Sequence, residues 1–320
     1  MKKIAVLTSG GDAPGMNAAI RSVIRMAIFL HCEIVGIHRG YSGLLEEDFR
    51  QLTSRDAGGI VLRGGTMLRT ARCPAFFDED NQKKGAQILK NHGIEGLVVI
   101  GGDGSFMGAR ALANQGIPCI GLPGTIDNDI ACSEYTIGYD TAMNTAVEAI
   151  DKLRDTTQSH DRCSVVEVMG HHAGYIALNV GIATGAVAVL LPEIPFDFER
   201  DILERMRQTQ VTGKKHFIII VSEGVVGAQE LANQIQAATG VDSRATVLGH
   251  IQRGGSPTVR DRVNASLMGY HAIDLLDKGI YNRVVAVSGD KIVDYDVNVA
   301  LSMHKTIDRD MIEIAKAISI

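Results

Sequence analysis

The sequence predicts an α/β protein with mostly parallel sheets, divided into two domains. Short apolar runs alternate with segments of helical spacing along the 320 residues, which is the pattern of parallel strands joined by right-handed crossovers. The 35 glycines cluster after the apolar runs, as expected for tight strand-to-helix turns. A chain of this length exceeds one comfortable core, so we expect two domains of ordinary size.

The first half of the chain alternates strands and helices. Residues 16–30 place Ile20, Val23, Ile24 and Ala27 on one helical face. Residues 97–100 form a short, fully apolar run, which is typical of a parallel strand covered on both faces. The other expected elements are strands over 4–7, 34–37 and 119–122, an irregular glycine-rich stretch over 40–72 and a helix over 81–92.

The second half continues the alternation without a Pro/Ser-rich or low-complexity linker. We therefore expect the domains to be joined by crossing segments and not by a tether. The expected helices are 141–157, 229–239, 259–278 and 308–318, and the expected strands are 165–168, 187–191, 217–221, 245–248 and 284–287.

Composition limits the classes of function. A net charge of −5 argues against general binding of polyanions such as nucleic acids. The five cysteines include no CxxC pair, so neither a zinc site nor a disulfide framework is indicated, and a reducing cytoplasm fits. No run approaches the roughly 18 apolar residues of a membrane span, and the apolar run after Lys2 and Lys3 is too short for a signal peptide.

A glycine-rich loop over 8–15 separates the first strand from the first helix. Free backbone N–H groups at a helix start can cradle phosphate, although the loop matches neither GxGxxG nor a P-loop, and a plain strand-to-helix turn is the alternative. Arg21 and Arg25 lie one helical turn apart and share a face. They are either solvated or part of a site for an anionic effector.

Gly101-Gly102-Asp103-Gly104-Ser105 follows the apolar strand over 97–100. Glycines let the backbone approach a ligand, while the Asp103 carboxylate can hold a cation. Mg²⁺ commonly binds through one carboxylate plus substrate phosphates. A bare turn is the alternative.

The motif Pro-Gly-Thr-Ile-Asp-Asn-Asp over 123–129 follows another buried strand, and Pro123 and Gly124 are expected to end that strand. Asp127 and Asp129 are then candidates for proton transfer or metal binding, because ligands of parallel sheets sit beyond the carboxyl ends of strands. Two solvated turn residues are the alternative. One active cleft would gather the polar residues at strand ends, namely Asp12, Asp103, Asp127, Asp129, His171, Glu223, His250 and Arg253.

Two neighbouring histidines, His171 and His172, follow the strand over 165–168. Adjacent residues are expected to point to different sides, which makes a poor metal pair.

Four strings resemble the bacterial ATP-dependent 6-phosphofructokinase (phosphofructokinase A) family: LTSGGDAPGMNAAIR, VVIGGDGS, GLPGTIDNDI and VLGHIQRGGSPT. The likeness runs essentially end to end. It implies two Rossmann-like three-layer α/β/α domains with the active site in the cleft between them. It assigns 1–138 plus 251–301 to a larger ATP-binding domain and 139–250 plus 302–320 to a smaller domain for fructose 6-phosphate.

The reaction implied by the resemblance is phosphoryl transfer from MgATP to the 1-hydroxyl of fructose 6-phosphate. Asp127 would be the base, with Asp129 adding negative charge beside it, and Asp103 would hold Mg²⁺. Thr125 and Arg72 would touch the transferred group, with His171 among the catalytic residues. The matching ATP-site residues are Gly11, Arg72, Cys73, Gly102, Asp103, Gly104 and Ser105.

For the sugar phosphate, the resemblance implies contacts from arginines, whose planar fork suits phosphate, and from their neighbours. Arg162 and Arg244 would reach in from a neighbouring subunit, which makes a homotetramer the expected state. The matching substrate residues are Thr125, Ile126, Asp127, Asp129, Arg162, Met169, Gly170, His171, Glu223, Arg244, His250, Ile251, Gln252 and Arg253.

Gly104 and Gly124 predict ATP as the phosphoryl donor, because small residues leave room for the nucleotide. Pyrophosphate-using relatives carry a bulkier acid at the position of Gly104 and a Lys at that of Gly124. Two departures concern the sugar-phosphate site. His171 stands where the family has Arg, and Tyr175 replaces a usual acid.

An effector site for ADP or phosphoenolpyruvate is also implied between subunits. Val187 replaces a metal-binding Glu there, and Val211 and Thr212 stand in place of a phosphate-binding Arg, beside an apparent one-residue insertion. We therefore expect a weakened or altered response to ADP. The matching residues are Arg21, Arg25, Arg154, Gly185, Ala186, Val187, Lys214, Lys215 and His216.

The departures leave a second interpretation open, a catalytically impaired nucleotide-binding regulatory paralogue. The retained Asp103, Asp127, Arg162, Arg244 and Arg253 argue against it. A dinucleotide-dependent oxidoreductase fits the fold class but lacks GxGxxG after the first strand. We expect a cytoplasmic enzyme with no nucleic-acid or membrane partner.

Overall fold

The computed structural model describes residues 1–319 and divides into two compact units. Unit 1 contains residues 1–126, 130–141 and 253–305, and unit 2 contains residues 127–129, 142–252 and 306–320. The prediction of an α/β protein with two mostly parallel sheets is confirmed, since each unit contains one sheet. The three-residue segment 127–129 groups with unit 2, although its neighbours belong to unit 1.

Unit 1 is built on a seven-stranded sheet in the order β11-β10-β5-β4-β1-β2-β3. Only the two edge pairs, β2 with β3 and β10 with β11, are antiparallel. β1 and β4 are parallel neighbours, with Thr8 opposite Ile100, so their carboxyl ends meet. The strands are β1 (Lys3–Thr8), β2 (Glu33–Ile37), β3 (Phe49–Leu52), β4 (Gly96–Gly101), β5 (Cys119–Pro123), β10 (Arg283–Ser288) and β11 (Lys291–Asp296).

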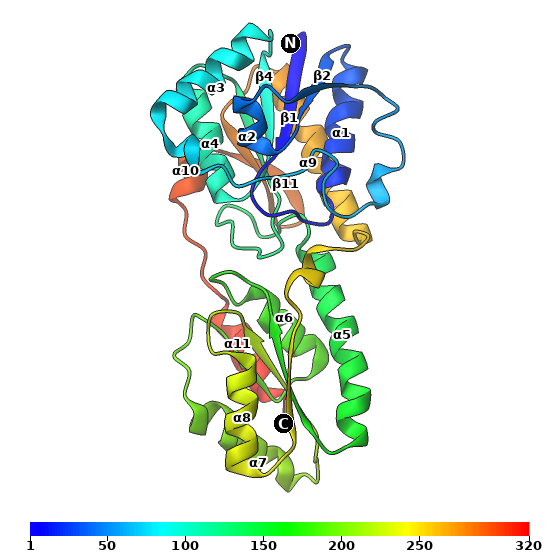
Figure 1. Ribbon diagram of the computed structural model, residues 1–320, viewed down its shortest axis with the longest axis vertical. Coiled ribbons are helices and arrows are strands. Elements are labelled where there is room, and N and C mark those ends of the chain that lie inside the picture. Colours follow the sequence, from blue (N-terminus) through cyan, green and yellow to red (C-terminus); the bar gives the residue numbers. More distant parts are fainter. Residues whose placement is uncertain (320) are drawn as a thin grey trace. The chain divides into compact units, whose positions relative to one another are not determined.

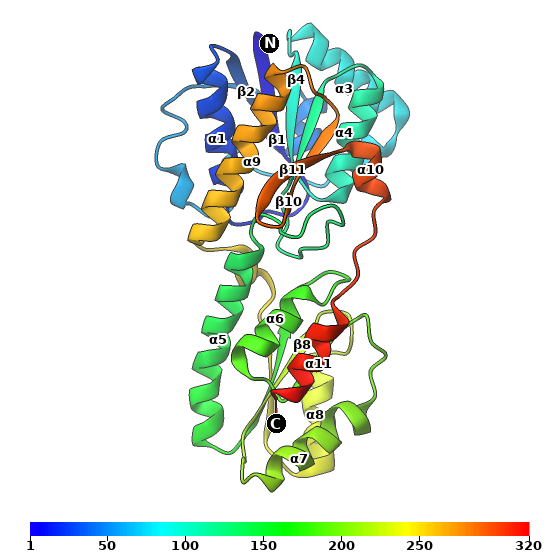
Figure 2. The same cartoon turned by 180° about the vertical axis from the view of Figure 1, so that it is seen from behind.

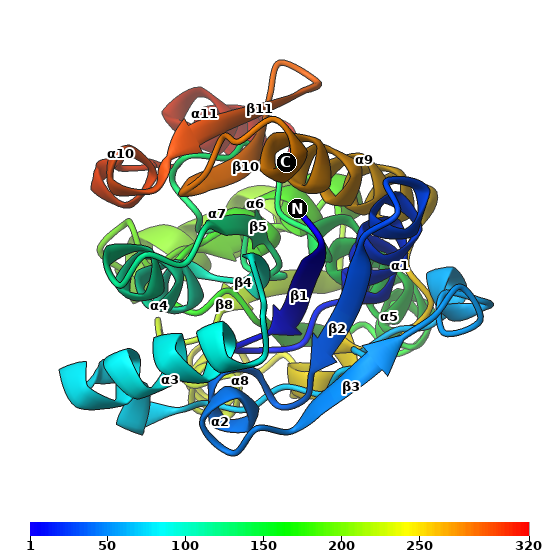
Figure 3. The same cartoon turned by 90° about the horizontal axis from the view of Figure 1, so that it is seen from above.

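Helices cover both faces of this sheet (Figure 3). α1 and α9 pack against each other on one face. α2, α3 and α4 cover the other face, where Leu7, Ile37, Leu89 and Leu112 form a buried core. The helices are α1 (Met16–Phe29), α2 (Gly40–Leu45), α3 (Glu79–Asn91), α4 (Asp103–Asn114), α9 (Val259–Asp277) and α10 (Val297–Ser302), with 3-10 turns at Ile60–Leu62 and Pro74–Phe77.

Unit 2 contains a fully parallel four-stranded sheet in the order β7-β8-β6-β9. Figure 1 labels the helices of this unit. Its core joins Val165 and Ile219 of the sheet to Met206 and Leu231 of the covering helices. The strands are β6 (Cys163–Val168), β7 (Ala188–Leu190), β8 (Phe217–Ser222) and β9 (Ser243–Val247). The helices are α5 (Tyr139–Ser159), α6 (Tyr175–Thr184), α7 (Glu204–Val211), α8 (Ala228–Thr239) and α11 (Arg309–Ala317), with a π-helix at Glu199–Leu203 and a 3-10 turn at Gly249–Arg253. The first three residues of α5 and the last residue of this 3-10 turn belong to unit 1.

Figure 2 shows the helices from behind, including α11, which packs against α6. The predicted strands and helices are all found, with ends shifted by one or a few residues. The stretch 40–72 was expected to be irregular, but it contains α2, β3 and a 3-10 turn. Pro123 was expected to end its strand and is its last residue. Within residues 1–319, no helix is long and apolar enough to cross a membrane.

Candidate active site

The glycine-rich loop after β1 lies against a cation. A methyl group added at Gly11 would come within 2.5 Å of Nη1 of Arg253, so a side chain at this position would have to displace the guanidinium. The same Nη1 donates to the carbonyl of Asp12 at 3.3 Å. Arg253, expected at the sugar phosphate, is therefore held in unit 1 beside the loop expected to bind ATP. A positive charge beside free backbone N–H groups suits a phosphate.

A second segment of unit 1 is tied to this loop by side-chain hydrogen bonds. Asn17 donates to the carbonyls of Arg63 and Gly64 and accepts from the N–H of Met67 at 2.7 Å. Thr70 donates to the carbonyl of Gly10 at 2.8 Å. These contacts place the chain leading to the exposed Arg72 and the half-buried Cys73 next to the glycine loop.

Asp103 is the first residue of α4 and is exposed, as is Gly104. No atom lies within 4 Å of a methyl group built at Gly104, so there is open space at this turn. Ser105 is buried instead, and its hydroxyl donates to the carbonyl of Ser9 at 3.2 Å. Ser105 thus joins the turn after β4 to the loop after β1.

The residues after β5 differ in burial. Ile126 is fully buried, and the carbonyl of Thr125 accepts from the hydroxyl of Thr136 at 2.7 Å. Asp127 is 6% exposed, whereas the side chain of Asp129 is half-buried. Asn128 between them has a φ of 53°, in the left-handed region. The turn at Asn128 therefore places the two carboxylates in different surroundings, with Asp127 buried and Asp129 half-buried.

In unit 2, one carboxylate organises the turn after β6. Glu223 Oε1 accepts from the backbone N–H groups of Gly170 and His171 at 3.1 and 2.6 Å. The N–H of Met169 donates to Oε1 of the fully buried Gln252 at 2.8 Å. Nε2 of Gln252 is buried and has no hydrogen-bond partner within residues 1–319. A buried amide donor without a partner is rare and indicates a place for a polar ligand or water.

His171 lies beside Asp129, with Nδ1 3.6 Å from Oδ2 of that carboxylate. Its backbone φ is 58°, and its side chain is 63% exposed. The expectation that His171 and His172 point apart is wrong, because their ring centroids are 4.1 Å apart; the two residues lie in a turn and not in a strand. Burial, together with Glu193 and Asp129, raises the pKa of Tyr175 to about 12, so its hydroxyl stays neutral near pH 7.

Arg162, directly before β6, and Arg244, on the neighbouring strand β9, both contact the carboxylate of Asp242. Nε of Arg162 lies 2.6 Å from Asp242, and Nε of Arg244 lies 3.1 Å from it. The hydrogen bond from Arg162 is the main cause that lowers the pKa of Asp242. Asp242 is not among the residues predicted from the sequence, where its only signal is an acid two residues before Arg244. His250 and Ile251 are exposed on the 3-10 turn that follows β9.

The expected effector residues fall into two groups. Arg21 and Arg25 lie on α1 of unit 1. In unit 2, Arg154 donates to the carbonyl of Thr184. Burial and then Arg154 lower the pKa of Lys214. Burial, Lys214 and Arg154 lower the pKa of His216, so these three form one electropositive cluster. Gly185 ends α6 with a φ of 60°, Ala186 and Val187 are almost fully buried, and Lys215 is exposed.

Glycine-rich turns at adjoining strand ends, with a cation beside one of them, define a phosphate-binding α/β protein. The family model described as phosphofructokinase matches residues 3–276. The chain belongs to the phosphofructokinase family. It is 54% identical to proteins of Bacillus mycoides and Bacillus cereus named ATP-dependent 6-phosphofructokinase, over all of this chain and all of each relative.

Solved structures agree on the fold. Phosphofructokinase from Saccharomyces cerevisiae matches with a TM-score of 0.87 and 32% identity over 99% of this chain. The phosphofructokinase of Pichia pastoris in the T-state matches with a TM-score of 0.89 and 33% identity, also over 99% of this chain. The chain spans only 47% and 36% of those two chains. A pyrophosphate-dependent phosphofructokinase from Marinobacter aquaeolei, at 23% identity and a TM-score of 0.86, shares the fold.

Proposed function

We propose that this chain transfers the γ-phosphoryl group of MgATP to the 1-hydroxyl of D-fructose 6-phosphate, giving fructose 1,6-bisphosphate and ADP. The observation that carries the proposal is the guanidinium of Arg253 held against Gly11 at the loop after β1. Phosphoryl transfer depends mainly on positioning and charge neutralisation, and a cation over a glycine loop supplies both.

The donor would be held by residues of unit 1. The loop at Gly11 and the turn at Gly102 and Gly104 would line the triphosphate, and Arg72 would neutralise charge on the transferred group. The exposed carboxylate of Asp103 fits Mg²⁺, which prefers oxygen ligands. Within residues 1–319 there is no cluster of three metal-binding side chains, which fits an ion that takes its other ligands from phosphate and water. When bound, Mg²⁺ would neutralise charge on the phosphate oxygens.

The acceptor sugar would be held mainly by residues of unit 2. Asp127 would accept the proton of the 1-hydroxyl, and Asp129 would favour that acceptance through its negative charge. His171 would stand where the family has Arg. Glu223 and Gln252 would fix the turn at 169–171, and Nε2 of Gln252, which has no partner among the residues that the structure describes, would donate to the sugar. Arg162, Arg244 and His250 would contact its phosphate.

ATP is the proposed donor. The open space at Gly104 supports it, because a bulkier side chain would occupy that space. Gly124 was expected to be small in order to leave room for the nucleotide. In the structure, a methyl group at this position would lie 2.9 Å from Ile100 and 3.0 Å from Met16. Its small size therefore serves packing in unit 1 and does not by itself distinguish the donors.

A coupled assay for fructose 1,6-bisphosphate tests the proposal. The purified chain is incubated with fructose 6-phosphate, Mg²⁺ and either ATP or pyrophosphate. Turnover with ATP well above that with pyrophosphate is the expected result. A preference for pyrophosphate would overturn the donor assignment, and no product with either donor would overturn the activity and favour a regulatory paralogue.

We also propose a cytoplasmic homotetramer in which Arg162 and Arg244 serve a neighbouring subunit. The effector response is altered. Val187 is 1% exposed and packs in the core of unit 2, so it offers no ligand for the metal of ADP. The cluster of Arg154, Lys214 and His216 still suits an anion such as phosphoenolpyruvate. Tight, magnesium-dependent activation by ADP in the coupled assay would contradict this.

A further inference from the structure

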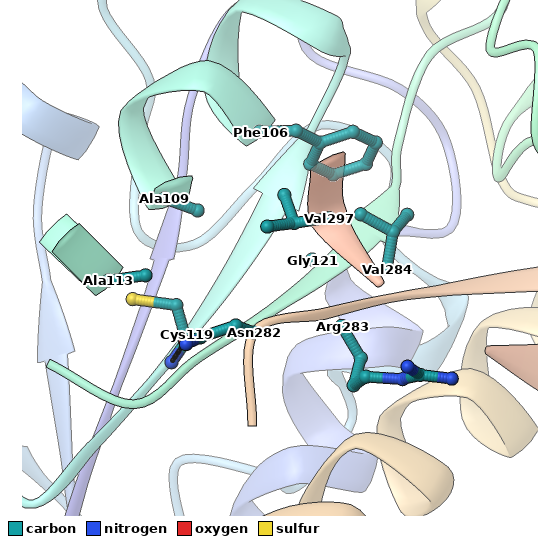
Figure 4. A pocket seen from close by; sticks show the side chains of 9 residues that line it. All are labelled: Phe106, Ala109, Ala113, Cys119, Gly121, Asn282, Arg283, Val284 and Val297. Atoms are coloured by element: carbon teal, nitrogen blue, oxygen red, sulfur yellow. Dashed lines mark hydrogen bonds between the residues drawn. The ribbon is translucent and has the colours of Figure 1, made fainter. Parts of the chain in front are cut away.

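Two cavities in the structure differ in what they can hold. In unit 1, a gap among Phe106, Ala109, Val284 and Val297 has no room for a water molecule (Figure 4). In unit 2, a cavity of about 430 Å³ opens beside the edge strand β7. That volume lies in the range of small-molecule sites.

The cavity of unit 2 is mainly apolar. Leu178 of α6, Val189 of β7 and Ile312 of α11 contribute to its wall, as do Ile194 and Phe196 of the loop after β7. The π-helix Glu199–Leu203 supplies two more wall residues, Arg200 and Asp201. Short π-helical segments are rare and are concentrated at functional sites.

Three cations line the cavity, and two of them have a carboxylate partner. Arg200 is paired with Asp201 at 2.7 Å, and Lys316 with Glu313 at 2.8 Å. Arg205 is different, because within residues 1–319 it forms no ion pair. The cavity therefore has one half-buried cation whose charge is not balanced by contact.

Among the described residues, only one nitrogen of the Arg205 guanidinium, Nη1, makes hydrogen bonds. Nη1 donates to Ser319 Oγ at 2.7 Å and, at 3.3 and 3.5 Å, to the carbonyls of Val187 and Lys316. Among the described residues, Nε and Nη2 make no hydrogen bond. These two groups form the edge of the guanidinium that binds a carboxylate through two parallel hydrogen bonds. Burial lowers the pKa of Arg205, and the carboxylates of Asp201 and Glu313, which do not contact it, oppose this shift only in part.

We propose that this cavity binds a small amphipathic carboxylate, with its anionic group on Arg205 and its apolar body against Leu178, Val189 and Ile312. At roughly 30 Å³ for each water-sized group, the volume admits a ligand of about ten to fifteen non-hydrogen atoms. The cluster of Arg154, Lys214 and His216 does not line the cavity, although two other expected effector residues, Ala186 and Val187, are part of its wall. The proposal does not depend on the proposed reaction.

Titration calorimetry with octanoate tests the site on the full-length protein, with octanol as the uncharged probe of equal length. Octanoate is expected to bind the unaltered protein more tightly than octanol. Arg205→Gln should weaken octanoate about 10- to 100-fold and leave octanol unchanged, because only the charge-assisted hydrogen bonds are lost. Arg205→Lys should lie between, since it keeps the charge without the planar fork.

A second variant keeps the test decisive if Arg205→Gln fails to fold. Ala315 lies on α11 and lines the cavity. Ala315→Leu fills space without removing the cation and favours a helix. It is expected to abolish binding of both probes, whereas Ala317→Leu, which is not a lining residue, should not. Absence of octanoate binding up to about 1 mM, or binding unchanged in both Arg205→Gln and Ala315→Leu, would overturn the proposal.

Discussion

Asp261 is expected to be a strong stabilising residue of unit 1, although it lies outside the candidate active site. Its carboxylate, on the first turn of α9, is fully buried. It accepts hydrogen bonds from the hydroxyl of Tyr135, the N–H of Gly138, and both the N–H and the hydroxyl of Thr141. These donors belong to the segment after the 123–129 motif and to the first turn of α5, so Asp261 fixes the entry to that helix.

Asp261→Asn removes two of these interactions while keeping the shape of the side chain. One amide oxygen still accepts, but the NH₂ group faces N–H and O–H donors. Hydrogen bonds to a charged group contribute about 1.5–3 kcal/mol each, so two lost bonds give about 3–6 kcal/mol. Burial of the ionised carboxylate has its own cost, which raises the pKa of Asp261, and a neutral amide avoids that cost. We therefore expect a net loss of about 3 kcal/mol.

Thermal unfolding followed by circular dichroism measures this loss. A change of this size corresponds to a fall in Tm of roughly 6–12 °C in a domain of the length of unit 1. Tyr135→Phe is the matched control, because it removes one donor and leaves the carboxylate with three. It should lower Tm by about a third as much. A Tm for Asp261→Asn within 1–2 °C of the unaltered protein, well below this estimate, would refute the reasoning.

Three further changes have defined outcomes. His171→Arg should lower KM for fructose 6-phosphate or raise kcat in the coupled assay, by up to about 10²-fold, because a guanidinium beside Asp129 supplies a fixed cation; unaltered kinetics would show that the position is idle. Val187→Glu should lower the free energy of unfolding by about 3 kcal/mol, measured as a fall in Tm, because the carboxylate would be buried in the core. It should not create activation by ADP, and a stable, ADP-activated variant would contradict this. The pKa of His216 is lowered in the folded protein, so its contribution to stability is present above its unfolded pKa and is lost as pH falls through the folded value; His216→Gln should flatten the decline in Tm between pH 7 and 5, and an unchanged slope would argue against it.

Much of the fold could be predicted because the central strands are short apolar runs. β1, β4 and β8 are buried along almost their whole length, as expected for parallel strands covered on both faces. The edge strands β3 and β11 escaped prediction, because half-exposed edge strands carry polar residues. Their antiparallel pairing depends on neighbours that the local sequence does not reveal.

The helix α4 was also not predicted, and the reason is physical. Its glycines disfavour a helix by local propensity. Gly108 is required by packing, since a methyl group there would lie 2.5 Å from the ring of Tyr41. Tertiary contact therefore overrides propensity. α6 was not predicted either, because its β-branched residues and Gly181 give a weak helical signal.

The candidate site residues at strand ends could be proposed from the sequence, but not the contacts that hold them. Asp242 contacts both Arg162 and Arg244, and Arg162 lies 80 residues away from it in the sequence. Asn17 fixes a segment 46 to 50 residues away. Such hydrogen bonds depend on which elements the fold brings together, and no local pattern specifies them.

Kinetics of Asp127→Asn test the central proposal most directly. The variant keeps the shape of the buried side chain and removes its basicity, so kcat with MgATP and fructose 6-phosphate should fall by about 10²–10⁴, while KM for both substrates changes little. Turnover at the full rate of the unaltered protein would contradict the assignment of Asp127 as the group that accepts the hydroxyl proton.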